Sequence, residues 1–254
     1  MSNNPQIDNT YGLASLQGEL LDIMKFVHSF CVENGIVYSL TGGSLLGAIR
    51  HGGFIPWDDD FDIMLDRANY DKFIDCASCY TGTDFVMEPD QWVYRVRKHH
   101  KEGTAFVPCI DLFVMDRVPE GKLASKLQVL RLRIIQGMLR DNHKKQNFSL
   151  IYRLCIGVTA FMGKFVNKEK LLARYDRLCR KGNSGNAKQL SILNDRFKLL
   201  SLRYDDDLMV EVELHDFEDT QFYITKKYHD YLYLQFGDYM QLPPVEERIP
   251  MHSD

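Results

Sequence analysis

The sequence predicts a mixed α/β fold in which helices flank a sheet of short buried strands. Apolar residues recur at helical spacing over residues 12–34, which indicates an amphipathic helix. Residues 36–40 and 61–65 are short apolar runs typical of buried strands, and residues 108–115 are apolar on both faces except at one position, the pattern of a central strand. Helices and strands thus alternate along the chain, as they do in layered α/β folds.

The remaining segments extend this pattern with elements of both kinds. Their predicted bounds are a helical turn over 45–50, helices over 70–79 and 226–236, a half-exposed strand over 93–98, one or two strands after Leu208, and three helices between 123 and 180 with breaks near Asn142 and residues 163–167.

The bulk composition is that of a folded protein. With 254 residues, of which 45% are apolar, the chain can bury a substantial core. We expect a single domain over residues 1–254, with a basic helical insertion at about 121–181. The formal net charge of -4 gives no support for a nucleic-acid binder, so no nucleic-acid partner is expected.

Positive charge is concentrated in the insertion. Residues 121–181 contain fifteen Lys or Arg and three acids, a balance of +12 that leaves -16 for the rest of the chain. This asymmetry suggests that one face meets something anionic, such as a membrane surface or a phosphorylated polymer. A solvated helical face balanced by nearby acids explains the same charges.

Neither the cysteines nor the amino terminus indicate secretion. The six cysteines are scattered, and the first residues lack both a basic start and an apolar run. We therefore expect a cytoplasmic protein, with a peripheral position at the inner face of the cytoplasmic membrane as an option. Residues 149–166 are notably apolar, but Arg153 and Lys164 interrupt them, and a span needs about 20 mostly apolar residues. We interpret this segment as a core helix, with an interfacial helix as the alternative.

The chemistry is expected to lie on paired carboxylates. Asp60 and Asp62 flank Phe61, and residues two apart in a strand project to the same face. Two such carboxylates resist being ionised together, so the pair either takes up protons or binds a cation. Carboxylate oxygens favour Mg²⁺ or Mn²⁺. Asp111, within an otherwise apolar strand, is the candidate for a third ligand, because an unpaired charge there would be costly.

A glycine-rich turn precedes these acids. Gly42, Gly43 and Ser44 fall at a predicted strand-to-helix junction, where glycines allow close backbone approach and free helix N–H groups point at an anion. The turn therefore predicts a phosphate cradle. Lys98, at the end of a basic strand, is a further candidate for contact with a phosphate.

These motifs together resemble a known family. The run from Gly42 to Asp62, Gly-Gly-Ser-Leu-Leu-Gly-Ala-Ile-Arg-His-Gly-Gly-Phe-Ile-Pro-Trp-Asp-Asp-Asp-Phe-Asp, is similar to the signature of the LicD family, which is related to fukutin. Residues 110–113, Ile-Asp-Leu-Phe, resemble that family's later acidic strand. Residues 236–244, Phe-Gly-Asp-Tyr-Met-Gln-Leu-Pro-Pro, resemble its closing motif.

The resemblance implies a fold and a reaction. The fold is that of a polymerase-β-like nucleotidyltransferase, an α/β (α+β) structure with a mixed sheet, flanking helices and a helical insertion. The reaction is the transfer of phosphocholine, or a related phosphoalcohol, from a CDP-linked donor to a cell-surface glycan of the lipopolysaccharide, capsule or teichoic acid type. The implied partners are thus the CDP-linked donor and the glycan acceptor.

The resemblance also assigns roles to residues. Asp60, Asp62 and Asp111 would be catalytic and would hold the metal ions, with Asp58 as a further candidate ligand. The donor-binding residues implied or predicted are Gly42, Gly43, Ser44, Arg50, His51 and Lys98.

We expect the metal ions to neutralise charge on the transferred phosphorus and the leaving CMP, while an acceptor hydroxyl attacks in line. Asp111 could accept the proton, directly or through a metal-bound hydroxyl. Two alternatives stay open: attachment of a whole nucleotide, which uses the same metal site, and a non-catalytic binder of anionic glycan or membrane.

Overall fold

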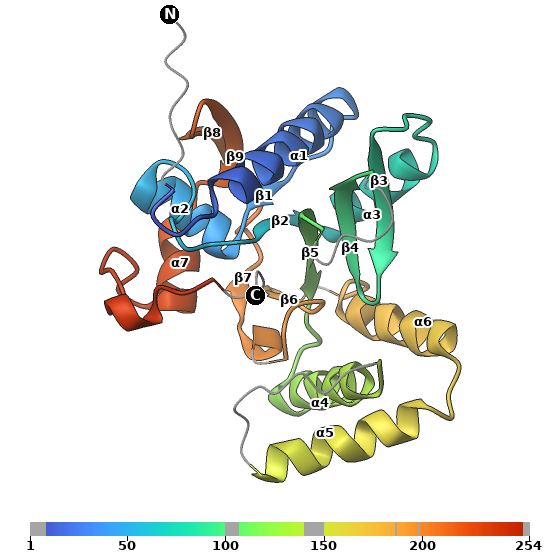
Figure 1. The fold of residues 1–254 in the computed structure, drawn as a ribbon. Helices are drawn as coiled ribbons and strands as arrows, with labels where there is room; N and C mark the ends of the chain where they lie inside the picture. The colour runs from blue at the N-terminus through green and yellow to red at the C-terminus, as the bar shows by residue number, and fades with distance from the viewer. Residues whose placement is uncertain (1–8, 100–106, 140–149, 186, 198, 251–254) are drawn as a thin grey trace, which may run out of the picture. The chain divides into compact units, whose positions relative to one another are not determined.

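The computed structural model describes residues 9–99, 107–139, 150–185, 187–197 and 199–250 (Figure 1). The chain divides into two compact units. The first, called here the motif unit, comprises Met1–Val114 and Asp207–Asp254, and the second, the basic unit, comprises Met115–Asp206. The α/β class predicted from the sequence is confirmed, because seven α-helices and nine strands are assigned among the described residues.

The motif unit contains five strands of a seven-stranded sheet, in the order β1-β2-β5-β4-β3. The pairs β1–β2, β4–β5 and β3–β4 are antiparallel. The strands of this sheet are β1 (Ser39–Leu40), β2 (Phe61–Asp66), β3 (Phe85–Asp90), β4 (Val93–Lys98) and β5 (Cys109–Arg117), the last of which continues into the basic unit.

Four helices and a hairpin complete the motif unit. Helix α1 packs against β4, α3 against β2, and α2 against both β2 and α7, while the hairpin strand β9 lies beside β1. Their bounds are α1 (Ala14–Glu33), α2 (Gly42–His51), α3 (Arg67–Ser78), β8 (Val212–Phe217), β9 (Thr220–Thr225), α7 (Tyr228–Phe236) and the short helix η3 (Val245–Glu247).

An aromatic cluster forms part of the core beneath the acidic strand. Phe61 is fully buried, and its ring lies 5.5, 5.2 and 5.9 Å from those of Phe54, Phe217 and Phe222. Burial of one such ring contributes roughly 1.5–3 kcal/mol. The cluster ties β2 to the β8–β9 hairpin and so fixes which face of β2 is left for its acidic side chains.

The basic unit is built of helices packed beside a short antiparallel ladder. Strand β6 (Gln189–Ile192) pairs with the end of β5 and with β7 (Tyr204–Asp205). The helices are α4 (Lys122–Leu139), α5 (Leu150–Gly163) and α6 (Lys168–Cys179), with short turns η1 (Arg180–Gly182) and η2 (Leu199–Ser201). Figure 1 shows α4 and α5 side by side, in green and yellow, and the two helices are in contact.

Hydrogen bonds between buried polar groups connect the elements of this unit. The Gln136 side-chain amide donates to the Tyr175 hydroxyl (2.9 Å) and to the Asp195 carbonyl (2.8 Å).

Within the described ranges, no helix has both the length and the apolar character that crossing a bilayer requires.

Most predicted elements are confirmed, and the differences have local causes. The basic region contains the three predicted helices, and the break predicted at residues 163–167 separates α5 from α6. The break predicted near Asn142 lies outside the described residues. Strand β1 is shorter than expected, because the Ile36 amide still bonds the Cys31 carbonyl and the Val37 amide bonds the Asn69 side chain. Helix α2 begins earlier than expected, at Gly42, after Thr41 in extended conformation. Strands β3, β6 and β7 were not predicted.

Candidate functional site

The acidic pair lies at the start of β2, as its spacing predicted. Asp60 precedes the strand and Asp62 is its second residue, while Phe61 and Ile63 between and after them are fully buried. The Asp62 amide donates to the Ser44 hydroxyl oxygen (2.9 Å), and the Thr41 amide donates to the Asp62 carbonyl (3.2 Å). The acidic strand is therefore bonded directly to the first turn of α2.

Two carboxylates flank the glycines of that turn. A side chain at Gly43 would collide with the Asp58 carboxylate, and one at Gly42 would lie 3.5 Å from Asp62 Oδ2. Gly42 also has a φ of 54°, which favours glycine. Because a helix N-terminus favours negative charge, the first turn of α2 stabilises acids at this position. Asp58, Asp62, Gly42 and Gly43 are thus brought together, and Ser44 is buried behind them.

Buried contacts fix this junction from both sides. The Tyr231 hydroxyl, on α7, lies 2.5 Å from the Thr41 hydroxyl and accepts the Gly42 amide at 3.4 Å. On the other side, the fully buried Gln17 side chain donates to the carbonyls of Ile55 (3.1 Å) and Asp58 (2.9 Å). The loop that carries Asp58 is consequently held in place by α1.

Asp111 lies on β5, the neighbour of β2, and its carboxylate is paired with Arg95. Arg95 stands opposite Asp111 in the β4–β5 register, and its Nε and Nη2 donate to Asp111 Oδ1 (2.7 Å) and Oδ2 (3.3 Å). Arg95 also forms an ion pair with Asp90. Although burial opposes its charge, the hydrogen bond and the charge of Asp111 raise the pKa of Arg95.

Cys109 links the two acidic strands electrostatically. Its thiol donates to Asp111 Oδ1 at 3.6 Å. Burial, followed by the charge of Asp111, raises the pKa of Cys109 to about 12, and the charge of Asp62 contributes in the same direction. One thiol is therefore influenced by carboxylates from both β2 and β5.

The predicted metal ligands do not form a ready-made cluster. Within the described part of the chain, no group of three or more His, Cys, Asp or Glu side chains is arranged to hold a metal ion. Asp58 and Asp62 adjoin the start of α2, whereas the cation that contacts Asp111 is Arg95. Asp59, which the sequence argument did not single out, is the most buried acid of this loop, at 1% exposure.

Arg50 and His51 lie at the other end of α2, in an aromatic and cationic setting. Arg50 Nη1 donates to the carbonyl of Tyr239 (2.8 Å), which joins α2 to the predicted closing motif. Burial, then the charge of Arg248, lowers the pKa of Arg50, while Asp58 opposes that shift. Burial and Arg50 also lower the pKa of His51, whose ring lies 6.0 Å from that of Trp57.

Lys98 is directed elsewhere. Its ammonium group forms an ion pair with Asp22 on α1, with Nζ and Oδ2 2.9 Å apart. Positions 95 and 98 of a strand face opposite sides of a sheet, so Lys98 lies on the face away from the Arg95–Asp111 pair. The structure brings Arg95, not Lys98, beside the candidate acids.

Two cations near the candidate residues were missed by the sequence analysis. Arg95 could have been found from the alternation of β4, but only once its register with β5 was known. Arg248 follows the closing motif, where nothing in the sequence distinguishes it. In the structure its guanidinium lies 5.4 Å from the Trp57 ring centre, close enough for a cation–π contact.

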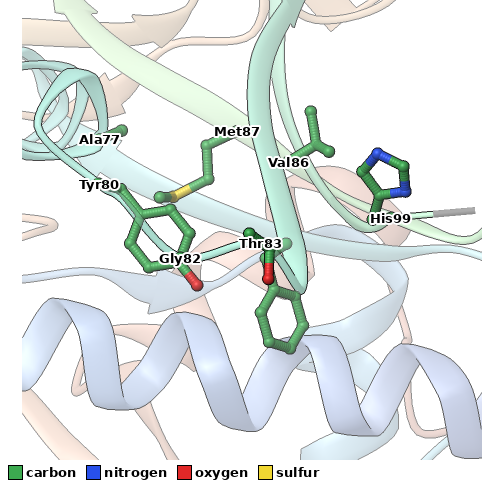
Figure 2. A pocket seen from close by; sticks show the side chains of 8 residues that line it. Ala77, Tyr80, Gly82, Thr83, Val86, Met87 and His99 are labelled. Atoms are coloured by element: carbon green, nitrogen blue, oxygen red, sulfur yellow. The ribbon is translucent and has the colours of Figure 1, made fainter.

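A separate cavity of about 480 Å³ lies between the end of α3 and the β3 edge (Figure 2). Tyr80, Met87 and His99 are among its lining residues, and Figure 2 shows Met87 extending toward the Tyr80 ring. None of the predicted site residues lines it, and its described lining holds no acid. It therefore offers no support to the candidate site.

Comparison with known proteins gives both long and short matches. Residues 35–116 match the family described as LicD/FKTN/FKRP, nucleotidyltransferase domain. The chain is 30% identical to the lipopolysaccharide cholinephosphotransferase LicD of Haemophilus influenzae, over 91% of this chain and 92% of that protein. It is also 48% identical over 44 residues to the human ribitol 5-phosphate transferase FKRP, a match to 17% of this chain and 9% of that protein.

Proposed function

This chain belongs to the LicD family, and from that premise we propose that it is a phosphotransferase that moves phosphocholine, or a related phosphoalcohol, from a CDP-linked donor to a cell-surface glycan. The observation that carries the proposal is the likeness to a cholinephosphotransferase over nine-tenths of both chains. The acceptor class is a glycan of the lipopolysaccharide, capsule or teichoic acid type.

The second part of the proposal is that the reaction depends on Mg²⁺ or Mn²⁺. The donor set suits such a cation, because the carboxylates of Asp58 and Asp62 adjoin the α2 start and Asp111 stands on the next strand. Asp60, Asp62 and Asp111 would hold it, with Asp58 as a further ligand. A divalent ion bound there would supply positive charge against the donor phosphates.

The chain's own cations have a role in binding the donor. A CDP-linked donor carries a diphosphate, and Arg50 and Arg248 provide positive charge close to Asp58 and Trp57. His51 lies beside the same ring. Fixed guanidinium groups are suited to phosphate, because their planar donor geometry matches phosphate oxygens. The first turn of α2 adds backbone N–H groups that favour an anion.

The proposed reaction exchanges one phosphorus–oxygen bond for another. The acceptor hydroxyl oxygen bonds to the phosphorus that carries the head group, the bond from that phosphorus to the CMP oxygen breaks, and CMP leaves with the bonding pair. The hydroxyl proton passes to a carboxylate, for which Asp111 is the candidate. Arg95 donates one hydrogen bond to each Asp111 oxygen, and the proton would be taken by a lone pair that these bonds leave open.

The test follows CMP release from a panel of donors. The protein is incubated with CDP-choline, CDP-ethanolamine, CDP-glycerol or CDP-ribitol, with Mg²⁺ and surface glycans, and compared with an Asp60→Asn, Asp62→Asn double variant. We expect the double variant to lose activity by a factor of roughly a hundred or more, because electrostatic stabilisation at such centres is worth ~3 kcal/mol or more.

The matched control is an Asp75→Asn, Asp84→Asn double variant, which removes the same charge from exposed positions of the motif unit. It should keep wild-type activity. Equal activity in the two double variants would show that Asp60 and Asp62 are not part of the catalytic site. Finding cytidine on the product instead of free CMP would indicate transfer of a whole nucleotide, and absence of turnover and of divalent-metal binding would indicate a non-catalytic binder.

A further inference from the structure

Helix α4 of the basic unit exposes a continuous apolar stripe. The stripe consists of Leu123, Leu127, Leu130 and Ile134, which are 81, 42, 54 and 39% exposed. Successive helical residues turn by about 100°, so spacings of four, three and four place these side chains on one narrow face. The opposite face of α4, which includes Val129, Leu132 and Ile135, is buried. The helix is therefore packed on one side and presents a second apolar side to solvent.

Cations border the stripe on both edges. Lys122, Lys126 and Arg133 lie along one edge and Arg131 along the other, by the same helical geometry. The helix contains no Asp or Glu. An apolar centre with cationic edges is the arrangement by which helices lie at the boundary between lipid headgroups and acyl chains.

A cavity of about 870 Å³ opens beside the edge that carries Lys122, Lys126 and Arg133. Lys188 and Arg203 also line it, so five cations meet there, and Glu120 is the single acid among its described lining residues. Leu130, from the stripe, lines the same cavity. The charged cavity and the apolar stripe are therefore continuous.

Two of the cations that line this cavity are held by hydrogen bonds to uncharged groups. Arg203 donates to the carbonyls of Leu200 (3.0 Å) and Leu202 (2.8 Å) and to the Ser125 hydroxyl (2.8 Å). Arg133 donates to the Phe197 carbonyl (3.1 Å). Burial lowers the pKa of Arg203, and repulsion from the charge of Arg133 adds to this shift. An anion in the cavity would relieve that repulsion.

We propose that α4 docks on an anionic phospholipid surface, with its leucine stripe in the headgroup boundary and a lipid phosphate in the adjoining cationic cavity. This goes beyond the proposed transfer reaction and does not depend on it. A soluble phosphate would explain the cavity but not the stripe. A second copy of the chain would explain the stripe, yet it would bring four cations of one α4 against four of the other.

The test is vesicle flotation of the full chain. Vesicles of phosphatidylglycerol mixed with phosphatidylcholine are compared with vesicles of phosphatidylcholine alone, at low and at high salt. We expect binding to the anionic vesicles only, and weaker binding at high salt because the charges are screened. A Lys122→Gln, Lys126→Gln variant should lose about thirtyfold in vesicle affinity, since each cation near the surface contributes about 1 kcal/mol. A Leu123→Ser, Leu127→Ser variant should also bind more weakly.

Two matched variants of the motif unit serve as controls. Val210→Ser, Leu214→Ser removes exposed apolar side chains, and Lys25→Gln, Lys226→Gln removes the same positive charge, so both should float like wild type. Wild-type flotation by the α4 variants would overturn the proposal, as would failure of the wild-type protein to bind anionic vesicles. So would binding of inorganic phosphate without vesicle binding, or a dimer in sedimentation that the leucine variant abolishes.

Discussion

Arg95 provides the positive charge that Asp111 needs on an otherwise apolar strand. Ile110 and Leu112 are fully buried on one face of β5, and Asp111, on the other face, is only 20% exposed, so an unpaired carboxylate there would be costly. The guanidinium meets that need with two hydrogen bonds, and a divalent cation would meet it too. Arg95 and the proposed metal ion would therefore both place positive charge beside the same carboxylate, and each would weaken the binding of the other.

Replacing Arg95 should make the proposed metal bind more tightly. In Arg95→Met the carboxylate of Asp111 no longer has its internal cation, so Mg²⁺ affinity, measured by titration calorimetry, is expected to rise roughly tenfold or more. Without Mg²⁺ the same variant should be less stable to urea than wild type, because the Asp111 carboxylate loses the guanidinium that compensates its charge.

Arg97→Met is the control for Arg95, since Arg97 lies on the same strand but pairs with Glu88. It should leave Mg²⁺ affinity unchanged. If Arg95→Met bound Mg²⁺ no better than Arg97→Met, Asp111 would not be a ligand of the metal.

A second residue, His28, couples stability to pH. Its Nδ1 lies 2.7 Å from the Tyr38 hydroxyl, and burial lowers its pKa. The folded state thus binds a proton less readily than the unfolded state, so stability is greatest above the unfolded pKa of 6.5 and falls as pH drops from there toward the folded pKa. In His28→Gln the free energy of unfolding, measured by urea titration, should fall less between neutral pH and about pH 5.

His215→Gln, on β8, leaves the His28–Tyr38 pair intact and is the matched comparison. A pH dependence that is unchanged in His28→Gln would mean that this histidine does not contribute to acid destabilisation.

At the scale of elements, the start of α2 and the acidic loop are built against each other. The loop's Asp58 carboxylate fills the space that a side chain at Gly43 would need. The hydrogen bond from the Asp62 amide to the Ser44 hydroxyl then joins the helix to β2. The glycine is thus required by a close approach of a carboxylate, and this approach puts negative side chains at the helix N-terminus.

This close approach predicts opposite effects of the same substitution in two helices. Gly18→Ala, in α1, adds a methyl group that meets nothing within 4 Å, and it should stabilise the protein by up to about 1 kcal/mol. Gly43→Ala should instead destabilise it and lower CMP release, because the Asp58 carboxylate must move. Urea unfolding of both variants measures the change in the free energy of unfolding, which should be positive for Gly18→Ala and negative for Gly43→Ala. A stabilising Gly43→Ala would show that Asp58 is free to leave the turn.

Elements were easier to predict from the sequence than their pairing. Helix α1 and the strands β2 and β5 could be predicted from the local periodicity of apolar residues, which depends only on residues close in the sequence. The Arg95–Asp111 pair depends on the register of β4 against β5, which no local pattern encodes. Arg248 reaches Trp57 from a part of the chain nearly two hundred residues away, so its place could not be predicted either.

At the scale of the whole molecule, the two compact units differ in the chemistry they carry. The predicted acids, the glycine turn and the closing motif all belong to the motif unit. The apolar stripe and the cationic cavity belong to the basic unit. The charge balance of the sequence reflects this division, with +12 over residues 121–181 and -16 elsewhere. The charge asymmetry of the sequence suggested contact with an anionic surface, but it did not show that leucines and cations lie side by side on one helix.

If the units carry separate functions, a variant of one unit should lose that unit's function and keep the other. Asp62→Asn removes a proposed ligand, so CMP release should fall by a factor of roughly a hundred or more while flotation with anionic vesicles stays at the wild-type level. Leu123→Ser, Leu127→Ser should do the reverse and keep CMP release on a water-soluble glycan acceptor, because that reaction needs no membrane. With an acceptor embedded in anionic vesicles, the leucine variant should lose activity as well, since the enzyme is no longer concentrated at the surface. A leucine variant that lost activity equally on both acceptors would show that α4 supports catalysis itself, and the division of function between the units would be wrong.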